Sequence, residues 1–333
     1  MEAGRSRSPS RLGARCAARC FWGANLVVLV CWLGLSEVRA DVPAEAVGAA
    51  PAVCIALGAG GASGLAHVLM LEALDELGVR PRMIAGSSIG AIIGALYASG
   101  MSGGEIRELI AGFVVPSDES LMQALVDEDA WRWIDFVQLD LGEGGLLSSE
   151  GFLSFLYDEL PVHTFEALEI PLKVVAADLW QREQVVLASG ELEPAIQASM
   201  ALPGVFKPVK RDGRLLVDGG TVNPVPYDLL LDSCDLVIGV DVIGQRTPPD
   251  SLVPSYFETV FNAVKVMQHA IMTNKRRYRP PDIYIVPEIR DIRALEFLRA
   301  EAVFEQAKPA KAELKRRLRD AMNSASAEEA PHG

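Results

Sequence analysis

The sequence predicts an α/β fold of three layers, in which a mostly parallel sheet is flanked by helices. Short continuous apolar runs, which are typical of buried parallel strands, recur along the chain. Segments with helical apolar spacing alternate with these runs, and the resulting βαβα order is that of a parallel sheet covered by helices. A length of 333 residues with 50% hydrophobic content suffices for one large domain of this kind, or at most two.

Apolar runs, helical periodicity and turn residues give the order of the elements. Strands are expected at residues 52–57, 82–86, 172–179, 183–189, 214–220, 236–243 and 282–287. Helices are expected at residues 64–78, 88–100, 194–201, 256–278 and 294–322. The residues after Asn323 are expected to form a disordered tail.

Composition divides the chain into four parts. Residues 1–40 form a leader, 41–51 a short Ala- and Pro-rich lead-in, 52–306 the main domain, and 307–333 a C-terminal helix with the disordered tail. Within the main domain, residues 102–168 are predicted to be a mainly helical insertion. This insertion either packs as ordinary helices or covers the functional site as a lid.

The leader has the features of a secretory signal peptide. A basic stretch precedes an apolar run from Phe21 to Leu35, and small residues at positions 38 and 40 precede Asp41. We expect cleavage near Ala40 and export to the periplasm or the outside of the cell. The alternative is an uncleaved membrane anchor, although the apolar run is shorter than the about 20 residues that span a bilayer. Removing residues 1–40 takes away six arginines and two glutamates, which changes the formal charge from −13 to −17.

The acidic composition excludes one class of partner. The formal charge is −13 and the sequence pI is about 4.9. Nucleic-acid binding requires clusters of Lys and Arg that bind phosphates, so DNA and RNA are not expected as partners. The same charge gives no general attraction to anionic membranes. The sequence leaves the oligomeric state open.

Few cysteines remain outside the leader. Three of the five lie within residues 1–40, and only Cys54 and Cys234 follow them. Both stand in apolar stretches, where buried thiols are more common than a bridge, so we expect two free thiols. No Cys and His spacing suggests a zinc site, and we expect neither a metal nor a cofactor.

The segment "GSSIG" at residues 86–90 has the G-x-S-x-G pattern of a nucleophile elbow. It lies between a predicted strand and a predicted helix, which is the context that this motif requires. The strained turn needs small neighbours on both sides of Ser88, and Gly86 and Gly90 meet that need. Ser88 would then stand at a helix N-terminus, which favours negative charge.

The histidines offer no evident partner for Ser88. None of the four follows a strand end with turn residues, as the histidine of a catalytic triad would; they are His67, His163, His269 and His332. A structural role is therefore expected for each of them, and a Ser-His-Asp hydrolase is disfavoured.

Another base is available in "LLVDGG" at residues 215–220, where Asp218 ends an apolar strand before Gly219 and Gly220. Ligands of open α/β folds bind at this end of the sheet, and Asp218 could accept the proton of Ser88 directly. The alternative is an aspartate that caps a hairpin turn, since Asp-Gly is common there. The motif alone favours neither.

The glycine-rich stretch "GAGGASG" at residues 58–64 follows the first predicted strand. A dinucleotide fingerprint requires a third glycine where Ser63 stands, and a P-loop requires a lysine after Gly64. The remaining role is an oxyanion hole, in which the N–H groups of Gly60 and Gly61 face a developing negative charge. The alternative is a simple turn between strand and helix.

These motifs, in this order, resemble the patatin-like phospholipases over most of residues 52–306. The resemblance rests on four quoted segments: "GLAHVLMLEALDELGV", "AGSSIGAIIGALYASG", "ASMALPGVFKPV" and "LVDGGTVNPVP". It implies a modified α/β-hydrolase architecture with Ser88 as nucleophile, Asp218 as base, and Gly60 and Gly61 as the oxyanion hole. Glycines that would support these motifs are Gly58, Gly64, Gly86, Gly90, Gly219 and Gly220.

The resemblance also implies the chemistry. It predicts a serine hydrolase of acyl esters, resembling phospholipase A or lysophospholipase, with a lipid substrate, an acyl-enzyme intermediate, no metal and transient contact with a membrane surface. The chain departs from the family loop at Ala59, where a glycine is usual, and at Ser63, where Lys or Arg is usual. These departures favour two alternatives: an esterase of neutral lipids or simple esters, or a catalytically weak lipid-binding relative.

Overall fold

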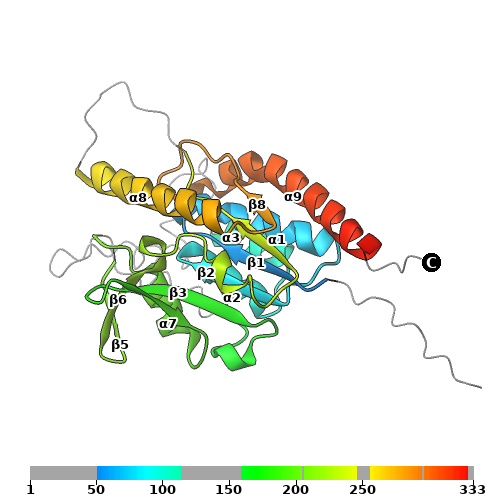
Figure 1. The fold of residues 1–333 in the computed structure, drawn as a ribbon. Coiled ribbons are helices and arrows are strands. Elements are labelled where there is room, and N and C mark those ends of the chain that lie inside the picture. The colour runs from blue at the N-terminus through cyan, green and yellow to red at the C-terminus, as the bar shows by residue number, and fades with distance from the viewer. Residues whose placement is uncertain (1–50, 114–158, 205, 246–255, 295, 329–333) are drawn as a thin grey trace, which may run out of the picture. The chain divides into compact units, whose positions relative to one another are not determined.

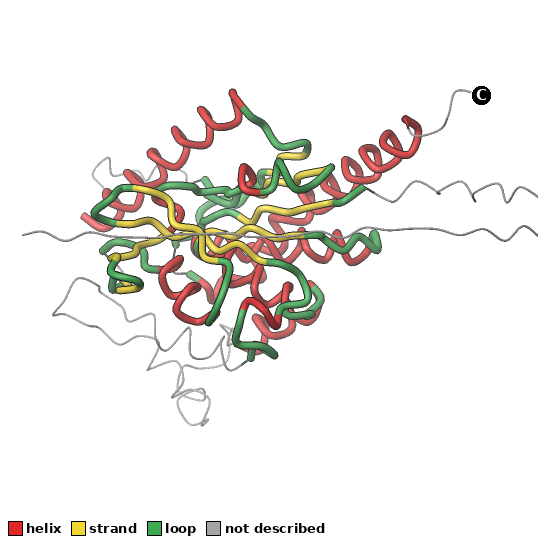
Figure 2. The backbone as a smooth tube through the Cα atoms, turned by 60° about the horizontal axis from the view of Figure 1, so that its bottom comes forward, coloured by secondary structure: helices red, strands yellow, loops and turns green. Residues whose placement is uncertain are grey.

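The computed structural model describes residues 51–113, 159–204, 206–245, 256–294 and 296–328. Strands form the middle layer, and helices lie on both sides of them (Figure 1, Figure 2). Seven strands follow the order β5-β6-β3-β2-β1-β7-β8, and β4 also pairs with β3. The run β3-β2-β1-β7-β8 is parallel, whereas the pairings β3–β4, β3–β6 and β5–β6 are antiparallel. The predicted fold class is therefore confirmed.

Seven of the eight described strands fall where the sequence predicts them. The strands are β1 Val53–Leu57, β2 Met83–Ser87, β3 Leu172–Asp178, β4 Glu183–Leu187, β5 Val209–Arg211, β6 Arg214–Asp218, β7 Leu236–Val240 and β8 Ile283–Ile285. Strand β5 was not predicted because three residues are too few to show an alternation.

The helices follow the predicted pattern with one correction. They are α1 His67–Glu76, α2 Ile89–Ala98, α3 Gly103–Phe113, α7 Leu192–Met200, α8 Tyr256–Tyr278 and α9 Ala300–Glu328. The sequence predicts a disordered tail after Asn323. This prediction is wrong for residues 324–328, because α9 continues to Glu328. Short 3-10 turns are η1 Gly61–Ala66, η3 Phe165–Ala167, η4 Gly219–Thr221, η5 Tyr227–Leu229 and η6 Phe297–Arg299.

The alternation of side chains along β1 divides the core between the two faces of the sheet. Ile55 and Leu57 belong to the large core cluster with helices α1, α2 and α9. Ala56 belongs to a smaller cluster with Tyr227 of η5 and Met272 of α8. Successive side chains of a strand point to opposite faces, so α8 covers the face opposite to α1, α2 and α9. Helix α9 crosses the predicted boundary at residue 306 and packs along the same core.

The pairing along β3 brings the ends of two strands together. Strand β2 pairs with the first half of β3, where Ser87 lies opposite Val175. Strand β6 is antiparallel to the second half, where Asp218 lies opposite Ala176. Because β4 pairs with residues of both halves, β2 and β6 must share the other edge of β3. Their carboxyl ends therefore meet head-on at neighbouring positions.

Some predictions fall on residues that the structure does not describe. The leader and nearly all of the lead-in are among them, as is most of the insertion at residues 102–168. Of that insertion the structure describes α3, which packs beside α1, and residues 159–168. The predicted lid thus lies outside the described residues. In the described part of the chain, no helix has both the length and the apolarity needed to cross a bilayer.

The prediction of two free thiols is wrong. Cys54 of β1 and Cys234 form a disulfide, with their Cα atoms 6.0 Å apart. Parallel pairing of β1 with β7 brings the two residues together although 180 positions separate them in the sequence. Local patterns contain no information about such long-range pairing, which is why sequence reasoning missed the bond.

Removing this disulfide should destabilise the protein. The bond closes a long loop. In the chain-entropy account, such a bond lowers the entropy of the unfolded chain and so raises the free energy of unfolding by about 2–5 kcal/mol. We expect a Cys54→Ala/Cys234→Ala variant to unfold at lower urea concentration than the wild type, as measured by circular dichroism. Dithiothreitol should lower the wild-type midpoint and leave that of the variant unchanged. Equal midpoints for wild type and variant without reductant would contradict the disulfide.

Candidate active site

Ser88 occupies a strained turn between β2 and α2. Its φ is +54° and its ψ is −125°, a conformation that costs a residue with a side chain about 1–3 kcal/mol. The residues two positions before and two positions after Ser88 must be glycine. A Cβ on Gly86 would lie 2.5 Å from the carbonyl oxygen of Gly90, and one on Gly90 would lie 2.1 Å from that of Leu57. The turn presents Ser88 at the N-terminus of α2, as a nucleophile elbow does.

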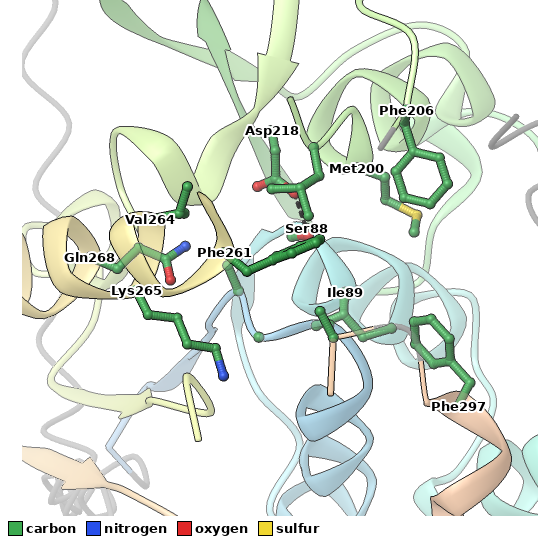
Figure 3. A pocket seen from close by; sticks show the side chains of 15 residues that line it. Ser88, Ile89, Met200, Phe206, Asp218, Phe261, Val264, Lys265, Gln268 and Phe297 are labelled. Carbon is green, nitrogen blue, oxygen red and sulfur yellow. Dashed lines mark hydrogen bonds between the residues drawn. The ribbon is translucent and has the colours of Figure 1, made fainter. Parts of the chain in front are cut away.

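Ser88 and Asp218 are hydrogen-bonded. The Ser88 hydroxyl donates to Oδ2 of Asp218 at 2.6 Å (Figure 3). Gly220 N–H donates to Oδ1 at 2.7 Å. Both side chains are buried. Burial raises the pKa of Asp218 to about 6, because desolvation outweighs the two hydrogen bonds. At neutral pH the carboxylate is ionised and is more basic than an exposed aspartate.

The turn after Asp218 fits closely against the sheet. A Cβ on Gly219 would lie 2.1 Å from the carbonyl oxygen of Val175, so only glycine fits there. The side chain of Gln268, on α8, donates to the carbonyl of Gly220 at 3.1 Å. The residues after Asp218 form the 3-10 turn η4, which Asp218 caps, rather than a two-residue hairpin. The turn that carries Asp218 is thus held by β3 at Gly219 and by α8 at Gly220.

The glycine loop contributes two residues to the lining of this pocket. Its neighbouring amides are bonded: Gly58 N–H donates to Val240 and Ala62 N–H donates to Ala294. The described residues offer no hydrogen-bond acceptor to the amides of Gly60 and Gly61, and both residues line the pocket beside Ser88. A Cβ on Gly60 would lie 2.3 Å from the carbonyl oxygen of Val242, which excludes larger residues. The predicted oxyanion glycines therefore lie next to the serine.

None of the described histidines hydrogen-bonds to Ser88 or Asp218. His67 is fully buried in α1, and its Nε2 bonds to the carbonyl of Gly58 at 2.8 Å. Burial lowers the pKa of His67 to about 4, so it is neutral and supports the glycine loop. His163 and His269 are exposed, and His332 lies outside the described residues. The described residues contain no cluster of metal-ligating side chains.

An apolar pocket opens beside the dyad. Its apolar walls come from several segments. Met200 ends α7, and Leu202 and Phe206 lie in the segment that follows it. Phe261 and Val264 lie on α8, and Phe297 lies in η6. Figure 3 shows Met200, Phe206, Phe261, Val264 and Phe297 around Ser88. The lining next to the serine hydroxyl is therefore mostly apolar.

Sequence reasoning missed residues that support Ser88 from distant segments. Ser88 N–H donates to Oγ of Ser199 on α7 at 2.8 Å, and the hydroxyl of Ser87 donates to the carbonyl of Asn223 at 2.7 Å. Gln268 on α8 was also missed. These residues carry no motif of their own, because their roles arise only when the helices pack against the strand ends.

Comparison with known families agrees with the motifs. Residues 55–231, more than half of the chain, match the family described as patatin-like phospholipase. The chain belongs to the patatin-like phospholipase family. The matched range includes the glycine loop, Ser88 and Asp218 of this patatin-like chain, whereas α8 and α9 follow it.

Curated relatives match over part of their length. An uncharacterized NTE family protein of Mycobacterium tuberculosis is 34% identical over 200 residues, which cover 60% of this chain and 51% of that protein. The patatin-like phospholipase domain-containing protein 7 of Mus musculus is 33% identical over 202 residues, which are 60% of this chain and 14% of that protein. The chain thus spans about half the length of the first of these relatives.

Solved structures with a similar arrangement are more distant in sequence. VipD from Legionella pneumophila aligns with a TM-score of 0.41 at 15% identity, covering 80% of this patatin-like chain and 67% of VipD. The type III effector protein ExoU aligns with a TM-score of 0.40 at 16% identity, covering 80% of this chain and 53% of ExoU.

Burial of Asp218 should cost stability at neutral pH. Its folded pKa of about 6 exceeds its ordinary value of 3.8, so between these pH values the folded protein holds a proton that the unfolded chain has lost. Stability therefore falls as the pH rises through this window, by on the order of 3 kcal/mol. We expect Asp218→Asn to be more stable than the wild type at pH 8 and nearly equal to it at pH 4, as measured by urea unfolding.

The control for this prediction is Asp212→Asn, which removes an equal charge from an exposed side chain. Its stability relative to the wild type should not vary in this way with pH. A wild type that is as stable as Asp218→Asn at pH 8 would show that the carboxylate is not destabilised by burial.

Proposed function

We propose that this patatin-like chain is a serine hydrolase of lipid acyl esters, of the phospholipase A or lysophospholipase kind, which works through a Ser88–Asp218 dyad. The observation that carries the proposal is the 2.6 Å hydrogen bond from the Ser88 hydroxyl to a buried carboxylate with a raised pKa. A serine needs such a base to become a nucleophile, and in the described residues no histidine lies within reach.

In the first half of the proposed reaction, ionised Asp218 takes the proton of Ser88 while Oγ attacks the ester carbonyl carbon. The N–H groups of Gly60 and Gly61 bind the negative oxygen of the tetrahedral intermediate. Asp218 then returns the proton to the departing alcohol oxygen, and the C–O bond to the alcohol breaks. The products of this half are the free alcohol and an acyl group on Ser88.

In the second half, a water molecule takes the place of the alcohol. Asp218 accepts one proton from this water as its oxygen attacks the acyl carbon, and the same glycine amides bind the oxyanion. Collapse breaks the bond to Ser88, which recovers its proton from Asp218. The fatty acid leaves, and the apolar pocket walls suit its alkyl chain. No step requires a metal or a cofactor.

We also propose that the protein is exported, through a signal peptide cleaved near Ala40, or otherwise held by an uncleaved anchor. The disulfide between Cys54 and Cys234 supports an oxidising compartment, where such bonds persist. Trp180 is 73% exposed at the turn between β3 and β4, and Val266 is 68% exposed on α8. Exposed apolar side chains of this kind support a transient contact with a lipid surface.

Removing either member of the dyad should abolish ester hydrolysis. We expect Ser88→Ala and Asp218→Asn each to lower kcat/KM for p-nitrophenyl butyrate by a factor of about 10³ or more, because one lacks the nucleophile and the other lacks its base. The measurement is initial-rate release of p-nitrophenol by purified protein. His269→Ala, on exposed helix surface near the pocket, is the matched control and should retain wild-type activity.

Two outcomes would count against this proposal. Equal rates for the wild type and Ser88→Ala would show that another group performs the reaction. A wild type that binds lipid without hydrolysing any ester would favour the lipid-binding alternative.

A further inference from the structure

A short segment after η4 touches all three parts of the site. The carbonyl of Asn223 accepts a hydrogen bond from the hydroxyl of Ser87, the residue before the nucleophile, at 2.7 Å. The N–H of Asn223 donates to the carbonyl of Gly219, the residue after the base, at 2.9 Å. The carbonyl of Pro224 accepts from the N–H of Ala59, the residue before the oxyanion glycines, at 2.8 Å. The segment is therefore bonded next to the nucleophile, the base and the oxyanion loop.

Lys275, on α8, binds this segment. Its ammonium group donates to the side-chain oxygen of Asn223 at 2.6 Å, to the carbonyl of Val225 at 2.8 Å and to the carboxylate of Asp228. These three acceptors match the three N–H donors of an ammonium group. The same nitrogen lies over the ring of Tyr227, 4.4 Å from its centroid, which adds a cation–π contact. The lysine side chain is thus held in one position.

Stability alone does not explain a buried cation at this place. The side chain of Lys275 is 16% exposed. Burial lowers the pKa of Lys275, and the carboxylate of Asp228 opposes that shift. A buried ion pair often contributes no more to stability than apolar side chains of similar volume would. The position that the lysine enforces on residues 223–225 explains it better.

Asn223 transmits the position of Lys275 to the site. Its side-chain NH2 group donates to Gln184 of β4 at 2.6 Å and to Asp228 at 2.9 Å, so every polar group of this buried residue is bonded. Buried networks that are fully satisfied in this way are rigid. A shift of Asn223 would also displace its bonds to the nucleophile strand and to the turn of the base.

A neighbouring contact on α8 has different partners. Arg279, one turn after Lys275, forms an ion pair with Asp232 between exposed side chains. It connects the same helix to the segment before β7, and its partner lies outside residues 223–225. Lys275 itself lies beyond residues 55–231, so the family match does not account for it.

We propose that Lys275 is a positioning residue for the acyl transfer. By binding residues 223–225, it fixes the oxyanion loop, through Ala59, relative to Ser88 and Asp218. This inference rests on the proposed acyl-ester hydrolysis. Lys275 is not among the described residues that line the pocket, so it acts through the segment and not on the substrate. A misplacement of catalytic groups by about 1 Å can lower a rate about 100-fold.

The test is Lys275→Met, which keeps an unbranched side chain and removes the three donors. We expect kcat for p-nitrophenyl butyrate to fall about 10- to 100-fold while KM changes less than about twofold, because the oxyanion amides and the dyad act in the transition state. Arg279→Gln is the matched control. It removes a cation that connects the same helix to the rest of the chain, and it should change neither constant.

A second variant keeps the test independent of an unpaired buried charge. Lys275→Met/Asp228→Asn removes both members of the ion pair, so it should unfold close to the wild-type urea midpoint and still show the loss of kcat. Wild-type kcat in this folded double variant would overturn the inference and leave the hydrolase intact. A rise in KM alone would also overturn it, because Lys275 would then only support the α8 wall of the pocket.

A readout without turnover separates this inference from the proposed function. In protein labelled with 15N at glycine, Lys275→Met should shift the NMR amide resonances of Gly60 and Gly61, whereas Arg279→Gln should not. If the wild type hydrolyses no ester, the proposed function fails, and these resonances still report on the positioning. Unchanged resonances in Lys275→Met, or equal shifts in Arg279→Gln, would overturn the role of Lys275.

Discussion

The hydrogen bond between Ser88 and Asp218 is the contact on which the rest of the site depends. It exists because β2 and β6 occupy the same edge of β3 and end at neighbouring positions, opposite Val175 and Ala176. The antiparallel entry of β6 into a mostly parallel sheet is therefore what brings Asp218 to Ser88. A parallel strand in its place would direct its carboxyl end away from the end of β2, and the carboxylate would not reach the serine.

This contact requires two residues in unfavourable states, one with a strained backbone and one with a buried charge. Ser88 adopts a strained positive φ, and Asp218 is ionised while fully buried. Close packing keeps both in place: side chains at Gly86 and Gly219 would overlap backbone atoms, and Ser199 and Gln268 hold the two turns from α7 and α8. Rigidity of this kind is what a preorganised site requires, because the groups must not rearrange during reaction.

Local motifs predicted Ser88, Asp218, Gly60 and Gly61 as site residues, and the structure brings these four residues to one pocket. Ser88 has a positive φ, and a Cβ at Gly60 or Gly61 would overlap backbone atoms. Such local constraints are visible in a short stretch of sequence. The Cys54–Cys234 bond, strand β5 and the pocket face of α8 were not predictable in this way. Strand β5 has only three residues, too few to show an alternation. The disulfide and the pocket face of α8 depend on contacts between segments far apart in the chain, and periodicity carries no information about which segments meet.

The most direct test of the central claim is the rate at which a fluorophosphonate labels Ser88, followed between pH 4.5 and 8 and located by peptide mass spectrometry. If Asp218 activates Ser88, labelling of the wild type should fall tenfold for each pH unit below about 6, where the carboxylate becomes protonated. Asp218→Asn should label slowly at every pH. A labelling rate that is independent of pH, or that is the same in Asp218→Asn, would contradict the account.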